Sequence, residues 1–139
     1  MTASGTVRQG GRLKAYRPID RPAREAALEA ALAAWARGDF FETHEFLEPA
    51  WMGTADAAER GLYQGLIKLA AAFVHDVRGN RAGVVKNLAG ARERLVEVAA
   101  VSPRLDGLDL AAVVAQIDAL DLARRGSRLA PPRISRRVP

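Results

Sequence analysis

The stretches DFFETHEFLEPAW, residues 39–51, and RGLYQGLIKLAAAFVHDVRGNRAGVVKN, residues 60–87, decide the fold. Both repeat apolar side chains every three or four residues, which is the spacing that places them on one face of a helix. The second stretch begins with a helix that is apolar around most of its circumference, so we expect this helix to be central. Gly79-Asn80 then ends one helix and caps the next, which predicts an antiparallel helix pair joined by a very short connection.

The same periodicity extends outward to the rest of the chain. It predicts an all-α fold, a single compact bundle of about five helices within residues 19–126. Asp39 is placed to cap the second helix, Thr54 or Asp56 the third and Asp109 the fifth. Pro49 predicts a bend or an early end of the second helix. The expected helices are 22–37, 39 to about 52, 54 or 56 to 78, 81–100, and 109 to about 126.

Glycines inside the third and fourth helices indicate where another element packs closely. Each costs up to about 1 kcal/mol relative to alanine in a helix interior, so a close neighbour is the expected reason for keeping it. Gly61 and Gly65 therefore predict close approach of another element, and Gly83 and Gly90 predict close packing against the third helix.

Composition bounds the class of protein. The 139 residues are 49% hydrophobic, which is enough for one core, and the absence of cysteine excludes disulfides and thiol chemistry. There is no apolar run long enough for a signal sequence or a membrane span, so we expect a cytoplasmic protein without membrane association. A homo-oligomer is compatible with the sequence.

The two ends of the chain are basic. Residues 1–24 and 124–139 together hold twelve bases and one acid, so the remaining centre has a net charge of −6 within an overall +5. We expect a flexible basic arm at 1–18 and a flexible basic tail at 127–139, solvated or folded back on the acidic centre. Phosphate contacts depend mainly on positive charge, but here the basic charge belongs to the tails and not to the domain, so nucleic-acid contact through the tails is the less favoured alternative.

Seven polar or aromatic side chains on the second, third and fourth helices form the candidate site. His44 and Glu48 are separated by one helical turn and so share a face, and buried amides must find hydrogen-bond partners. We therefore expect a common cluster or pocket. Its members are His44, Glu45, Glu48, Trp51, Gln64, His75 and Asn87.

Three interpretations of this cluster stay open. A buried polar network that fixes helix register is the simplest, with His44 bonded to Glu48 or to Gln64. His44 and Glu48 could instead bind a divalent metal, with His75 or Glu45 as a third ligand. Metal-dependent hydrolysis, or acid–base chemistry by a pair of carboxylates, would need more than this spacing provides, since the zinc-protease motif requires a second histidine where Glu48 stands.

Single residues of the cluster also have structural explanations. Trp51 could stack against a planar ligand, but a large aromatic side chain at a core-facing position is more often part of the packing. His75 stands near a helix C-terminus, where it can interact with the last carbonyls and with the helix dipole.

The motif His44-Glu45-x-x-Glu48-x-x-Trp51, followed by Gln64-Gly65-Leu66-Ile67, Ala70, His75, Gly79-Asn80 and Gly83, resembles a known family. This is the small all-helical family catalogued as domain of unknown function 309. The resemblance covers roughly residues 25–120 and excludes both tails. It implies a compact helical bundle in the cytosol with no established activity.

The sequence thus predicts a cytosolic helical module that binds a small ligand or a protein partner at the cluster around His44 and Glu48. Metal-dependent hydrolysis and a nucleic-acid accessory role are the alternatives. No catalytic residue is assigned.

Overall fold

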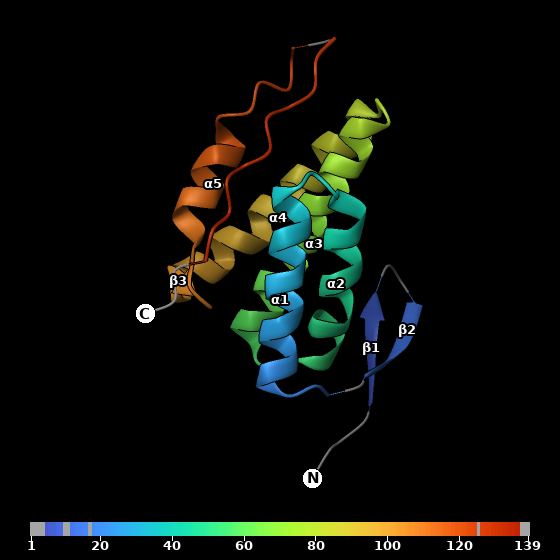
Figure 1. Cartoon of the computed structure of the whole chain (residues 1–139), viewed down its shortest axis with the longest axis vertical. Coiled ribbons are helices and arrows are strands. Elements are labelled where there is room, and N and C mark those ends of the chain that lie inside the picture. The colour runs from blue at the N-terminus through green and yellow to red at the C-terminus, as the bar shows by residue number, and fades with distance from the viewer. Residues whose placement is uncertain (1–4, 10–11, 17, 125, 137–139) are drawn as a thin grey trace.

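A computed structural model describes residues 5–9, 12–16, 18–124 and 126–136 (Figure 1). This part of the chain contains five helices and four short strands. Helices that follow one another in sequence pack against one another, so the all-α prediction is confirmed. The elements are β1 (Gly5–Gln9), β2 (Arg12–Tyr16), α1 (Arg21–Ala36), α2 (Phe40–Gly53), α3 (Ala57–Val77), α4 (Arg81–Val101), β3 (Arg104–Leu105), β4 (Leu108–Asp109) and α5 (Leu110–Asp118).

Each of the five helices begins with a side-chain cap. In every case the capping oxygen accepts a hydrogen bond from the backbone N–H three residues later, which satisfies a group that the helix itself leaves unpaired. The caps at Asp39, Asn80 and Asp109 were predicted, and of the two candidates for α3 the structure uses Asp56. The full set is Asp20, Asp39, Asp56, Asn80 and Asp109.

The core lies between α3 and its neighbours. Trp35, Phe40 and Phe73 join α1, α2 and α3 through ring contacts with centroids 5.0 to 5.4 Å apart. On the other side of α3, an added Cβ at Gly61 would lie 2.7 Å from Val98, and one at Gly65 would lie 2.8 Å from Leu95. The close approach predicted for these two glycines is therefore present, and the element that approaches is α4.

The second helix ends close to the expected residue, whereas the fifth ends earlier than expected. Pro49 does not end α2, which continues to Gly53. The last helix ends at Asp118 rather than near Gly126. Asp121 accepts a hydrogen bond from the backbone N–H of Ala123, and this local turn competes with continuation of the helix.

Two antiparallel strand pairs were not predicted. β1 pairs with β2 inside the arm expected to be flexible, with Gly5 opposite Tyr16, and the hairpin lies beside α2 (Figure 1). Residues 1–4, 10–11 and 17 of that arm lie outside the described residues. β3 and β4 are joined by Asp106-Gly107, both at positive φ, which is a typical two-residue hairpin turn.

In its described residues, the segment after α5 contains no helix or strand and contacts the bundle. Residues 129–136, which we call the C-terminal strap, run in extended form against the bundle. Trp35 donates its indole N–H to the carbonyl of Pro132 at 2.8 Å, and the N–H of Leu129 donates to Asp76 at 3.1 Å. Hydrophobic periodicity could not reveal this segment, because an irregular extended chain has no period. Residues 137–139 lie outside the described residues.

Among the helices that the structure describes, none is long and apolar enough to cross a membrane.

Candidate functional site

Three side chains that commonly bind metals meet on one turn of α2. Nδ1 of His44 lies 3.5 Å from Oε1 of Glu45 and 3.9 Å from Oε2 of Glu48. One ligand atom from each residue lies within 4.8 Å of the other two. The i, i+4 spacing predicted that His44 and Glu48 would share a face, and Glu45 joins them from the adjacent position.

The imidazole of His44 is the most informative member of this α2 cluster. Its Nδ1 atom is buried and has no hydrogen-bond partner among the described residues. The side chain of His44 is nevertheless 29% exposed and that of Glu48 is 24% exposed, so the cluster borders solvent. A buried ring nitrogen without a hydrogen-bond partner, beside two carboxylates, is an arrangement that a bound cation would satisfy.

The inner face of α2 fixes the position of these side chains. Leu47 and Trp51 are buried, and the hydroxyl of buried Thr43 donates to the carbonyl of Asp39 at 2.9 Å. Because α2 packs between α1 and α3, its backbone is held on both sides. His44 and Glu48 therefore lie at the edge of a fixed helix and not on a loop.

Trp51 belongs to the packing. Its side chain is 4% exposed, and the guanidinium of Arg60 lies over its ring at 5.8 Å from the centroid. One face of the indole therefore takes part in a cation–π contact. This arrangement matches the packing interpretation of Trp51 more closely than a stacking platform for a planar ligand.

His75 and Asn87 lie in a different place from the α2 cluster. Nδ1 of His75 is 3.2 Å from Nδ2 of Asn80 in the turn between α3 and α4, and Asn87 donates to the carbonyl of Gly83 at 2.8 Å. The ring of His75 lies so close to Gly83 that an added Cβ there would be 2.6 Å away. These residues pack the α3–α4 turn, and His75 does not provide a third ligand for His44.

Gln64 is also separated from His44. Helical spacing puts it on the same side of α3 as Lys68, whose side chain runs beside Gly90 of α4. Phe73, whose ring contacts Phe40 of α2, lies on the opposite side. The structure thus divides the predicted cluster into a group on α2 and a group along the α3–α4 contact.

A second polar group lies near the start of α3, and the sequence did not reveal it. Buried Tyr63 donates its hydroxyl to Glu59 at 3.1 Å, and Nε of Arg24 lies 3.5 Å from the same carboxylate. Burial, then the charge of Glu59, raises the pKa of the Asp106 carboxyl, and burial likewise raises the pKa of the Tyr63 hydroxyl. The dipeptide Asp106-Gly107 was the available signal, because it is a strong hairpin-turn pattern.

This group borders an open cleft of about 680 Å³. The cleft is formed by the starts of α1 and α3, the end of α4, the β3–β4 turn and the strap. Its lining mixes both signs of charge: Arg21, Glu25, Asp56, Ala58, Glu59, Val101, Ser102, Leu105, Asp106, Gly107 and Arg136.

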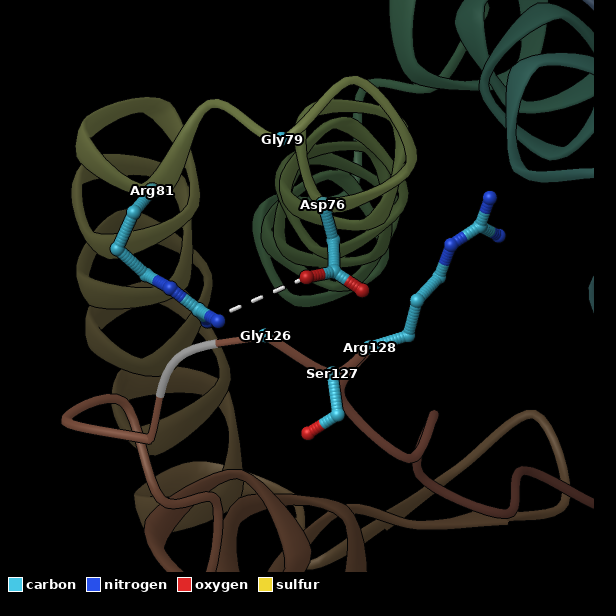
Figure 2. Close-up of a pocket in the computed structure, with 6 residues that line it drawn as sticks. All are labelled: Asp76, Gly79, Arg81, Gly126, Ser127 and Arg128. Carbon is cyan, nitrogen blue, oxygen red and sulfur yellow. Dashed lines mark ion pairs between the residues drawn. The ribbon is translucent and has the colours of Figure 1, made fainter.

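A smaller pocket of about 290 Å³ lies where the chain leaves α5 and returns to α3 (Figure 2). Figure 2 shows Asp76 between Arg81 and Arg128, with Ser127 directed away from it. Nη1 of Arg81 is 4.0 Å from Asp76, whose other oxygen accepts from Leu129, and Arg81 also donates to the carbonyl of Arg124. The contact of Leu129 holds the strap against α3, and the contact of Arg124 holds the preceding segment against α4.

Residues 28–87 match the model of the family described as Domain of unknown function (DUF309). The match confirms the family resemblance over a shorter range than the one expected, and it includes all seven residues of the predicted cluster. Searches of the curated proteins and of the solved structures return no significant match.

Proposed function

We propose that the DUF309-matching part of the chain is a ligand-binding helical module, and that its α2 cluster binds a divalent cation through His44, Glu45 and Glu48. The observation that supports this most directly is the buried Nδ1 of His44, which has no hydrogen-bond partner in the described structure and faces two carboxylates. A cation would satisfy the nitrogen and balance the acidic groups in a single step.

The distances are compatible with a shared ion. Zinc bonds to imidazole nitrogen and carboxylate oxygen are about 2.1 Å long, so two ligand atoms of a tetrahedral site are about 3.4 Å apart. The pairs involving His44 are 3.5 and 3.9 Å apart. All three ligand atoms lie within 4.8 Å of one another, so the glutamate side chains would have to move closer together to share one ion.

The donor set also indicates which ions suit the site. One imidazole and two carboxylates favour zinc or a related transition ion over magnesium, which prefers an all-oxygen shell. Three protein ligands leave a coordination position for water or for a small ligand. Hydrolysis would need a further acid or base positioned near that ligand, so the proposal is limited to binding.

The test is calorimetric titration of the untagged full chain with Zn²⁺, Mn²⁺ and Mg²⁺. We expect Zn²⁺ or Mn²⁺ to bind with one-to-one stoichiometry and His44→Gln to weaken binding at least tenfold. His75→Gln is the matched control, because it removes the only other histidine of the chain and should leave the affinity unchanged. Equal binding by wild type and His44→Gln would show that the ion binds elsewhere.

A purely structural role for the α2 cluster makes a different prediction. If His44 and Glu48 only fix the packing of α2, Glu48→Gln should change the melting temperature and no titrated ion should raise it. Under our proposal, ligand binding to the folded state raises the melting temperature of the wild type by mass action. Zn²⁺ or Mn²⁺ should therefore stabilise the wild type more than Glu48→Gln.

Nucleic-acid binding through the basic tails is less well supported. Arg136, one of the tail bases, lies 3.7 Å from Glu25 and 3.8 Å from Glu29. Phosphate contact would have to break these ion pairs. This arrangement agrees with a tail that folds back on the acidic centre.

A further inference from the structure

The C-terminal strap lies on side chains that contact it in the order of its own sequence. After Leu129, whose N–H donates to Asp76, the next contact is the indole N–H of Trp35, which donates to the carbonyl of Pro132 at 2.8 Å. Trp35 is 6% exposed, and Pro132 is buried against it. An indole that donates to the carbonyl of a proline-containing segment is a common means of proline recognition, because the rings pack while the N–H fixes the register.

The next residue of the strap is held on both sides of its peptide backbone. Gln116 of α5 donates from Nε2 to the carbonyl of Arg133 at 3.0 Å and accepts from the N–H of Arg133 at 2.7 Å. This pair of bonds fixes the position and direction of the peptide backbone. It does not depend on the side chain at 133, which is exposed. In a β-sheet, a neighbouring strand pairs with the N–H and C=O groups of an extended peptide in the same way.

The remaining contacts involve the side chains of the strap and not its backbone. Ile134 packs against the hydrophobic core, two residues after Pro132. Arg136 donates from Nε to the carbonyl of Asp106 at 2.8 Å, and its guanidinium lies near Glu25 and Glu29. Its side chain is only 16% exposed. The recognised pattern is therefore proline, any residue, an aliphatic residue, any residue, arginine.

We propose that this surface, formed by Trp35, Gln116, Asp106, Glu25 and Glu29, is a peptide-binding site for extended segments of the type Pro-x-aliphatic-x-Arg in a protein partner. We call it the strap site, and residues 132–136 occupy it in cis as an intramolecular ligand. The argument for this partner chemistry is the set of contacts itself, because each of them could be made by an identical segment of another chain.

Occupation in cis makes the strap a competitor for such a partner. A segment attached by a short linker is present at an effective concentration on the order of mM. A free peptide then meets a site that is mostly filled, and its apparent Kd rises in inverse proportion to the fraction of sites that are unoccupied. Binding in trans should become strong only when the strap is weakened.

The test uses the full chain and a labelled peptide, LAPPRISR, that copies residues 129–136. Ile134→Asp with Arg136→Glu should release the strap and leave the strap site intact. Fluorescence polarisation should show at least tenfold tighter peptide binding to this released variant than to wild type. Adding Trp35→Phe should reverse most of the gain, whereas adding Lys86→Gln, an exposed change on α4, should not.

The control peptide is LAPPRDSE, which carries the same two changes as the released variant and should not bind. A released variant that is folded by circular dichroism, yet binds both peptides equally, overturns the proposal. If that variant does not fold, the wild type decides the question: LAPPRISR at mM concentration should displace the strap and shift the NMR signals of the backbone N–H groups of Arg133 and Ile134 in the isotope-labelled protein, and LAPPRDSE should not. No shift with LAPPRISR also overturns the proposal.

Discussion

Replacing Gly65 by alanine tests whether α3 and α4 pack as closely as the structure indicates. An added Cβ would lie 2.8 Å from Cδ2 and 2.9 Å from Cγ of Leu95. Carbon atoms in ordinary contact are about 3.5 to 4.0 Å apart, so Leu95 would have to move by more than about half an ångström. Leu95 is fully buried and has little space into which it can move.

The expected magnitude follows from two opposing terms. Overpacking a close-packed core costs about 1 to 3 kcal/mol, and alanine gains up to about 1 kcal/mol over glycine in a helix interior. With the full helix-propensity gain subtracted, the free energy of unfolding should fall by up to about 2 kcal/mol. For a chain of this size the melting temperature should fall by up to roughly 8 °C.

Gly90→Ala is the matched control on the facing helix. An added Cβ there would lie 3.0 Å from Cδ of Lys68, a flexible side chain that can rotate away. Only the helix-propensity gain remains, so Gly90→Ala should be neutral or stabilising. Urea unfolding at neutral pH measures both variants. If Gly65→Ala is as stable as Gly90→Ala, the reasoning about the α3–α4 contact is wrong.

Two further changes test other parts of the structure. Asp106→Asn should raise the melting temperature at pH 7: burial and Glu59 raise the pKa of Asp106, so its contribution is favourable at low pH and is lost as pH rises through the folded-state pKa. Asparagine tolerates the positive φ at this position, and the stability difference should vanish below pH of about 4, the ordinary range of the group. Trp35→Phe leaves the buried carbonyl of Pro132 unpaired, which should cost about 1 to 3 kcal/mol. The backbone N–H groups of the strap should exchange hydrogen faster in that variant than in the wild type. Unchanged protection of the strap would contradict the assigned bond.

The helices were predictable because their signals are local. Asp39, Asn80 and Asp109 cap helices at the expected positions, and Gly61 and Gly65 predicted a close neighbour. Each of these inferences depends on a residue and on the few residues that follow it. The signal of the β3–β4 turn, Asp106-Gly107, is equally local, but the two-residue strands that it joins are too short to show an alternating pattern.

The candidate site was less predictable, since it depends on how helices face one another. The spacing of His44 and Glu48 identified their shared face on α2. It could not show that Gln64 and His75 lie toward α4, because a helical wheel gives the relative directions of residues on one helix but not their neighbours. The strap site involves Trp35 and Pro132, which are 97 residues apart, and no local pattern connects them.

That separation has a consequence for the order of folding. Most contacts in the bundle join consecutive helices, and such short-range contacts form early and quickly. During synthesis α1 can pack on α2 and α3, yet the indole N–H of Trp35 must wait for Pro132, which is made almost a hundred residues later. Nascent chains shortened before the strap would display the strap site on an otherwise helical domain, and a chaperone or a protease could recognise them by that exposed surface.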